Sequence, residues 1–136
     1  MTAKLKVFVS SVQKELEDER LIVQNLINTD VFLLAHCAPV LYEFEPASPK
    51  KALQACLDAL DACQVYLLIV GNEYGTRLGD LSITHTEYRR AKERGLPVLA
   101  FIKGERHMRR EDGTTALLAE LEADGPKYKR FGNVID

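Results

Sequence analysis

Short apolar runs alternate with longer segments of helical periodicity along this chain, and this alternation constrains the fold more than any other feature. Three of the runs are bounded by polar or turn residues and predict buried strands. These runs are residues 5–9, 64–70 and 96–102. Helical patterns over 12–28, 50–63 and 83–94 separate or follow them. The order favours a parallel sheet with right-handed crossovers and helices on both faces.

The run over 64–70 is the most hydrophobic, so we expect it in the middle of the sheet. Residues 31–34 and 40–44 are further extended candidates, with a bend over 36–39 between them. Ser48-Pro49 predicts a helix start, and Gly95 predicts a helix C-cap. The last third is predicted as a charged loop, a short helix and a segment that is extended or irregular. These cover residues 103–113, 114–123 and 128–135.

Bulk properties exclude several classes of protein. A chain of 136 residues predicts one domain. Its net charge of −2 argues against general nucleic-acid binding. Three cysteines without a CxxC pair do not resemble a disulfide framework or a zinc site, and we expect no metal or cofactor. We see no signal peptide, and the longest apolar run is too short to span a membrane. We therefore expect a cytoplasmic protein without a membrane partner.

Two serines end the first predicted strand. Ser10 and Ser11 could present hydroxyls and backbone N–H groups to a phosphate or a sugar. Ser10 and Gln13 also have the spacing of a capping box, so helix capping alone is the alternative. Arg20 lies more than two turns beyond this expected helix start, and we expect it to be solvated or salt-bridged.

Two carboxylates flank an aromatic residue at the end of the extended segment 40–44. Alternation along a strand sends Glu43 and Glu45 to the same side. There they could accept hydrogen bonds from ribose hydroxyls. Solvated loop carboxylates are the alternative.

The loop after the central strand reads Gly-Asn-Glu-Tyr-Gly. Gly71 and Gly75 would allow a sharp turn or a close approach of the backbone to a ligand, and Tyr74 could stack on a base or close a pocket. The loop matches neither a P-loop nor a GxGxxG motif. A purely structural loop is the alternative.

Glu87 is the strongest catalytic candidate. It is predicted in the first turn of the helix over 83–94, at the carboxyl edge of the sheet, beside the further ligand-binding candidates Ser82 and Thr84. A carboxylate there could attack an anomeric carbon or stabilise an oxocarbenium ion. Thr84 and Glu87 also form a capping-box pair, so a helix cap is the alternative. We expect the neighbouring His85 to be exposed.

These segments, in this order, resemble the DUF4062 family over about residues 5–103. The resemblance rests on an ordered set of short motifs. They are the KVFVSS strand at 6–11, L-x-x-ER at 16–20, the turn at 43–48, G-x-x-Y-G at 71–75, S-x-T-x-x-E-Y-x-x-A at 82–91 and G-x-P-V at 95–98. Gln64 departs from the Asp that is usual in the family, and Val12 and Glu15 stand where Thr and Asp are more usual.

The resemblance implies a flavodoxin-like three-layer sandwich with a mainly parallel sheet of four to five strands, similar to TIR domains and nucleoside deoxyribosyltransferases. In both groups a helix-borne Glu attacks or stabilises the sugar C1′, and Glu87 is the matching residue. Ser10 and Tyr74 would then be pocket contacts. Family members usually begin larger signalling proteins, so we expect residues 1–136 to be a single N-terminal module with downstream domains as partners.

Two functions remain open from the sequence. The first is a TIR-like signalling or interaction module that recognises a nucleotide or NAD-like ligand, associates with itself and reports to downstream domains. The second is a hydrolase or transferase that cleaves an N-glycosidic bond in NAD or a nucleotide through Glu87.

Overall fold

The computed structural model describes residues 4–12, 15–40, 49–105, 108–125 and 128–132, with the backbone alone for 49–52. Its main sheet has five parallel strands in the order β2-β1-β3-β6-β7. The strands are β1 (Leu5–Ser10), β2 (Cys37–Val40), β3 (Val65–Val70), β6 (Val98–Lys103) and β7 (Tyr128–Phe131). This is the flavodoxin-like order once the two-residue strands β4 (Arg77–Leu78) and β5 (Leu81–Ser82) are set aside. The predicted α/β fold and the central place of β3 are confirmed.

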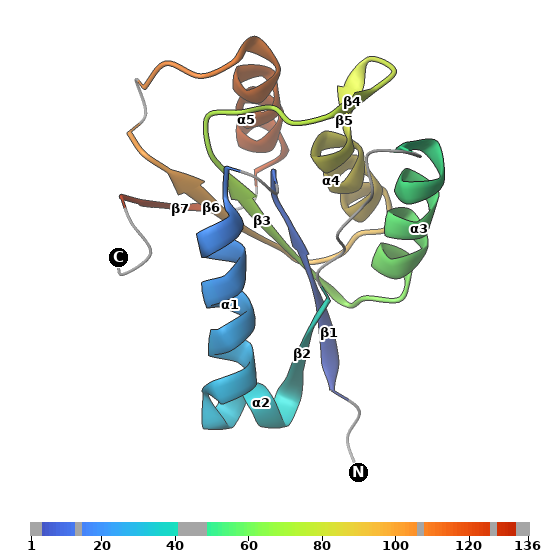
Figure 1. Ribbon diagram of the computed structural model, residues 1–136, viewed down its shortest axis with the longest axis vertical. Helices are drawn as coiled ribbons and strands as arrows, with labels where there is room; N and C mark the ends of the chain where they lie inside the picture. Colours follow the sequence, from blue (N-terminus) through green and yellow to red (C-terminus); the bar gives the residue numbers. More distant parts are fainter. Residues whose placement is uncertain (1–3, 13–14, 41–48, 106–107, 126–127, 133–136) are drawn as a thin grey trace.

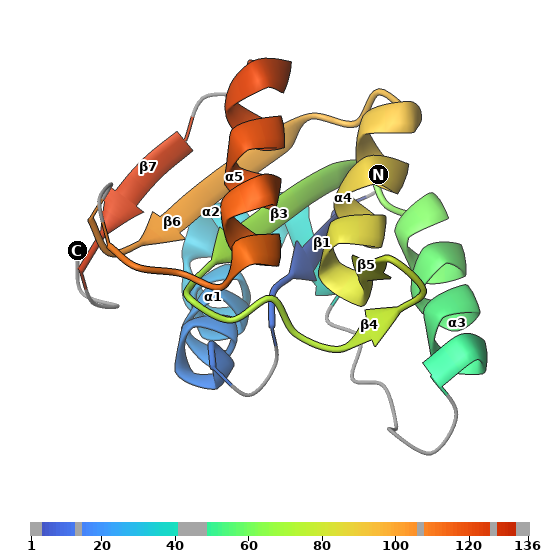
Figure 2. The same ribbon diagram turned by 90° about the horizontal axis from the view of Figure 1, so that it is seen from above.

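Helices cover both faces of the sheet, unequally (Figures 1 and 2). One face carries α1 (Glu17–Thr29) and α2 (Val31–His36), and the other carries three helices. These are α3 (Pro49–Asp61), α4 (Ile83–Glu93) and α5 (Asp112–Asp124). Alternate strand residues divide between two cores, because successive side chains point to opposite faces. Phe8, Tyr66 and Leu68 pack beneath α3, α4 and α5, whereas Val7, Val9 and Leu67 pack with α1.

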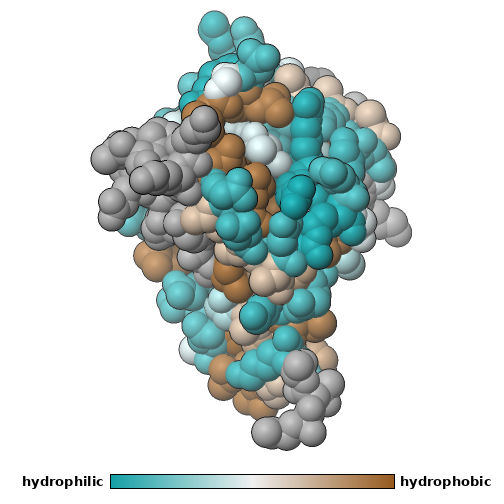
Figure 3. Space-filling view, turned by 90° about the vertical axis from the view of Figure 1, so that its right-hand side faces the viewer, coloured by the Kyte–Doolittle hydropathy of each residue, from teal (hydrophilic) through white to brown (hydrophobic). Residues whose placement is uncertain are grey.

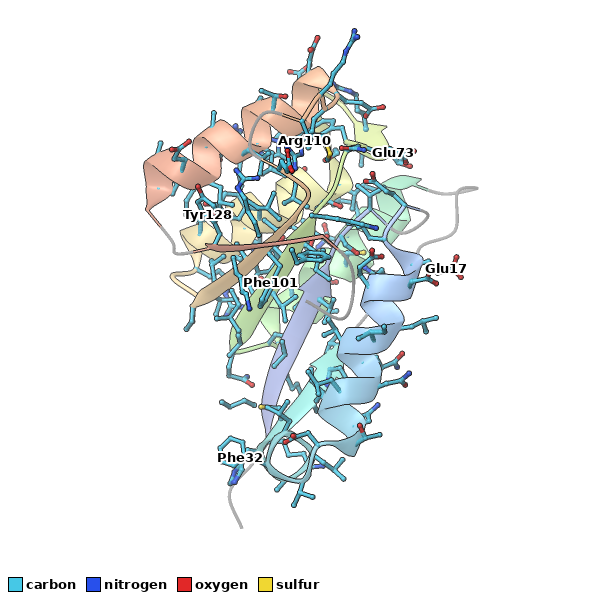
Figure 4. The ribbon with its side chains drawn as sticks, turned by 90° about the vertical axis from the view of Figure 1, so that its left-hand side faces the viewer. Glu17, Phe32, Glu73, Phe101, Arg110 and Tyr128 are labelled. Carbon is cyan, nitrogen blue, oxygen red and sulfur yellow. The ribbon has the colours of Figure 1, made fainter. Side chains whose placement is uncertain are left out.

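A groove of about 490 Å³ lies on the α1 face. Because α1 covers only part of this face, side chains of β3, β6 and β7 form the floor of the groove, with Phe101 among them (Figure 4). Leu26 on one wall and Leu99 on the floor are about half exposed. The groove is mainly apolar, and Glu87 is not among its lining residues.

The structure differs from the predicted elements in three places. The helix expected from residue 12 begins at Glu17. Residues 31–34 were predicted as extended and belong to helix α2, because the Asp30 side chain accepts hydrogen bonds from the N–H groups of Phe32 and Leu33 and caps that helix. The predicted bend over 36–39 is largely strand β2, which lies at the sheet edge, where Pro39 is tolerated.

Hydrophilic residues dominate the side of the molecule that carries α3, with hydrophobic residues among them (Figure 3). Among the described residues, no helix combines the length and apolar character that crossing a bilayer requires.

Candidate functional site

Glu87 lies in the second turn of α4 and takes no part in capping the start of that helix. The N-cap is Ser82, whose Oγ accepts a hydrogen bond from the backbone N–H of His85 at 3.1 Å. The interpretation of Thr84 and Glu87 as a capping box is therefore wrong. Helix geometry instead places these two residues on one face of α4, and both are buried.

The Glu87 carboxylate is held by groups from other elements. Ser10 Oγ, at the carboxyl end of β1, donates to Glu87 Oε1 at 2.7 Å. The Cys56 thiol of α3 lies close enough to Glu87 to influence the pKa of that carboxyl through hydrogen bonding. Ser10 and Cys56 are each 1% exposed and Glu87 is 6% exposed. A hydroxyl, a thiol and a carboxylate from three separated segments thus meet beneath α4.

Burial raises the pKa of Glu87 to about 7. The hydrogen bond from Ser10, the charge of Arg20 and the hydrogen bond from Cys56 act in the opposite direction, and they only partly offset the loss of hydration. Burial and the Glu87 charge together raise the pKa of the Cys56 thiol, so that thiol stays protonated. The carboxyl is therefore shared between its acid and ionised forms near neutral pH.

Ser11 is held by a buried arginine. Arg20 of α1 is 4% exposed, and its Nη1 donates to Ser11 Oγ at 3.0 Å and to the Val9 carbonyl at 3.5 Å. The sequence predicts that Arg20 is either solvated or salt-bridged. Its burial rules out the solvated alternative. Neither serine caps α1, whose N-cap is Leu16 without a side-chain hydrogen bond. The acidic first turn of α1 also disfavours a phosphate at that helix end.

The loop after β3 is filled by a side chain of this protein. Glu15 accepts hydrogen bonds from the backbone N–H groups of Asn72 and Glu73 at 2.7 and 2.9 Å. A Cβ at Gly71 would clash with that carboxylate, so the glycine permits this internal contact. Gly75 has φ +88°, which explains the second glycine. The structure supports the structural interpretation of Gly71 and Gly75.

Tyr74 belongs to a second polar cluster, on the far side of α4 from Glu87. Its hydroxyl lies 2.6 Å from Nδ1 of His85, whose Nε2 lies 2.6 Å from Oε2 of Glu120. His85 is two residues, and so about 200°, from Glu87 around the helix. His85 is 2% exposed, which corrects the expectation of an exposed side chain. Tyr74 is itself buried and its hydroxyl is engaged, so this conformation gives no support to base stacking.

Glu120 has more cationic partners than Glu87. Arg89 and Lys92 both donate to Glu120, in addition to His85. Although burial acts to raise the pKa of Glu120, these hydrogen bonds and the His85 charge lower it to about 2. The second cluster is therefore an ion-pair network that ties α4 to α5.

Of the predicted site residues, the structure brings together Ser10 and Glu87, whereas Ser11, the next residue after β1, bonds to Arg20 instead. Tyr74, Gly71 and Gly75 have structural partners elsewhere. Glu43 and Glu45 lie outside the described residues.

Sequence reasoning missed two contributors to the site, Cys56 and Tyr66. Cys56 was interpreted as a small buried hydrophobe; it is buried, but its thiol also contacts Glu87. Tyr66 lies on β3 next to β1, and its hydroxyl is near both Ser10 and Glu87. The apolar setting of both residues hid them, although a tyrosine in the most hydrophobic strand was a usable signal. Among the described residues, no group of three or more His, Cys, Asp or Glu could hold a metal ion.

Comparison with known proteins relates this chain to a protein family and to solved structures of similar fold. The CMP N-glycosidase BcmB of Clostridium botulinum is similar in structure, with a TM-score of 0.54 and 16% sequence identity, over 96% of this chain and 92% of that one. At this identity the similarity shows the fold alone. No curated protein matches the sequence. The profile of the domain of unknown function DUF4062 matches residues 6–135, and the chain therefore belongs to the DUF4062 family.

Proposed function

We propose that this protein cleaves the N-glycosidic bond of a nucleotide, with Glu87 as the reacting carboxylate. The observation that carries the proposal is the Ser10–Glu87 pair, in which a buried carboxyl near the carboxyl edge of a parallel sheet has its pKa raised to about 7. Ligands of open α/β sheets bind at that edge. The fold shared with a CMP N-glycosidase supports a nucleotide as the substrate class.

The chemistry that fits this carboxyl has two steps. Ionised Glu87 attacks C1′, the C1′–N bond breaks, and its electron pair leaves with the base, which takes up a proton from solvent. Water then attacks C1′, loses a proton to solvent, and displaces Glu87 as the free carboxylate with release of the sugar phosphate. A pKa near 7 keeps a substantial ionised fraction of Glu87 at neutral pH, and this ionised fraction is the form that attacks. The Ser10 hydroxyl orients the attacking carboxylate.

The test is base release from CMP, the other nucleoside monophosphates and NAD, followed by chromatography. Glu87→Gln should lower turnover of an accepted substrate by at least about 10³-fold, since it removes the nucleophile. Glu17→Gln, on the exposed start of α1, is the matched control and should keep full turnover. Turnover that Glu87→Gln leaves unchanged, or no release from any of these nucleotides, would contradict the proposal.

A second candidate is the interaction module, which an exposed apolar patch on α2 favours. Val31 is 86% and Phe32 67% exposed, at the end of the molecule remote from α5 (Figures 1 and 4). Sedimentation at rising concentration tests self-association: a mass that grows in the native protein and stays monomeric in Phe32→Asp supports the module. A constant monomer mass in both proteins contradicts it.

A further inference from the structure

Tyr66 places an unpaired hydroxyl group inside a hydrophobic core. The residue is completely buried on the central strand β3. Its ring lies 6.2 Å from the ring of Phe8 and 6.3 Å from that of Tyr88, between centroids. Its hydroxyl makes no hydrogen bond of normal geometry with any described residue. A phenylalanine would pack equally well and would avoid burying an unpaired hydroxyl, so the hydroxyl calls for a partner.

Two polar side chains lie close to this hydroxyl. β1 and β3 pair with Phe8 opposite Tyr66 and Ser10 opposite Leu68, so Ser10 and Tyr66 share the sheet face beneath α4. Burial raises the pKa of Tyr66 and the Glu87 charge adds to that rise, while Ser10, as a hydrogen-bonding neighbour, acts to lower it.

The hydrogen-bonding capacity of serine fixes the direction of such a contact. A serine hydroxyl has one donor hydrogen and two acceptor lone pairs. Ser10 already donates its hydrogen to Glu87 Oε1 at 2.7 Å, so it can only accept from Tyr66. The tyrosine, kept protonated by burial, is able to donate.

We propose that Tyr66 is a positioning residue whose hydroxyl donates to Ser10 Oγ and thereby holds the Ser10 hydrogen on the Glu87 carboxylate. The relay runs from β3 through β1 to α4. A hydroxyl that accepts a hydrogen bond becomes a stronger donor, so Tyr66 would strengthen the Ser10–Glu87 contact without touching substrate. The role of this relay in turnover rests on the function proposed above, but the contact itself does not.

The relay predicts how Glu87 titrates in four proteins with ¹³C-labelled glutamate: native, Tyr66→Phe, Ser10→Ala and the double variant. Ser10→Ala should raise the pKa of Glu87, and Tyr66→Phe should raise it by about 0.5, because each weakens a bond to the ionised form. The double variant should match Ser10→Ala alone, since Tyr66 acts through Ser10.

Tyr88→Phe is the matched control. It removes a hydroxyl from the same core, but that hydroxyl donates to Asp124 at 2.7 Å, and the pKa of Glu87 should stay constant. Thermal unfolding of each variant checks the fold. In an active enzyme, Tyr66→Phe should move the acidic limb of the kcat/KM profile to higher pH by the same amount.

The relay is overturned if Tyr66→Phe leaves the pKa of Glu87 unchanged, or shifts it equally with and without Ser10. The latter result would assign the hydroxyl a partner other than Ser10. Because this titration needs no substrate, an inactive protein would count against the proposed function and leave the relay test intact.

Discussion

Glu87 on α4 and Glu120 on the neighbouring helix α5 are both largely withdrawn from solvent, but their surroundings shift their pKa values in opposite directions. Glu120 is surrounded by Arg89, Lys92 and His85, and its pKa falls to about 2. Burial raises the pKa of Glu87 to about 7, and the hydrogen bond from Ser10 only partly offsets that rise. Both carboxyls lose hydration, so the difference lies in their partners: only Glu120 has several cations in direct contact. An ionised Glu120 suits a structural link, whereas Glu87 is poised for proton transfer or attack.

The largest effect should come from removing the structural carboxylate. Glu120→Ala leaves three cationic or hydrogen-bonding side chains without their shared acceptor and should lower the free energy of unfolding by about 3 kcal/mol at pH 7. Urea denaturation measures this. Glu93→Ala, which removes a 74% exposed side chain at 4.0 Å from Arg90, should cost less than about 0.5 kcal/mol. Equal losses in the two variants would argue against the network.

Glu87→Gln should raise the free energy of unfolding, whereas Glu120→Ala lowers it. The pKa of Glu87 in the folded protein lies above its ordinary value of 4.5. The contribution of the protonated carboxyl to stability is therefore fully present below pH 4.5 and is lost as pH rises toward 7. The variant has no charge to bury and should be more stable than the native protein by roughly 2 kcal/mol at pH 8, and by little at pH 5. Chemical denaturation at both pH values tests the sign. If Glu87→Gln is less stable than the native protein at pH 8, the ionised Glu87 carboxylate is stabilised by its partners, as the Glu120 carboxylate is.

Lowering the pH should expose the contrast in the native protein. Because the pKa of Glu120 is depressed, its stabilisation is present above pH 4.5 and disappears as pH falls toward 2. Replacing Glu120 by Gln should therefore flatten the acid limb of the stability profile by up to about 3 kcal/mol between these values. The Glu87→Gln variant should keep that acid limb. If Glu120→Gln loses stability at low pH as the native protein does, that loss comes from groups other than Glu120.

The smallest effect concerns Cys56. Cys56→Ala removes the thiol that helps to lower the pKa of Glu87 and should raise the pKa of that carboxyl by less than about 0.5. Cys63→Ala is a suitable control, because that thiol donates to the Ala59 carbonyl. A fall in the pKa of Glu87 in Cys56→Ala would contradict the proposed contact.

The fold was largely predictable because parallel strands and amphipathic helices leave periodic patterns. The runs that became β1, β3 and β6 were recognised, and Glu87 was chosen near the carboxyl edge of the sheet. Residues 31–34 misled because an apolar tetrapeptide fits a strand as well as a helix, and the Asp30 cap decided for α2.

The site was less predictable, because its contacts join residues far apart in sequence. Ser10 with Gln13, and Thr84 with Glu87, both match a local capping pattern. The hydrogen bond that forms is instead between Ser10 and Glu87, which are 77 positions apart. Likewise, nothing near Glu120 in the sequence announces its partners His85 and Arg89 on α4. Residue spacing predicts contacts within one helix or strand. It does not predict contacts between residues that are distant in sequence and that the sheet places side by side.

The most direct test of the contrast between the two glutamates is a site-resolved ¹³C carboxyl titration of the native protein, following Glu87 and Glu120 in one sample. The account predicts a midpoint near pH 7 for Glu87, while Glu120 stays ionised down to about pH 2. A Glu87 midpoint at or below the ordinary value of 4.5 would contradict it, and would remove the physical reason for placing the chemistry at that residue.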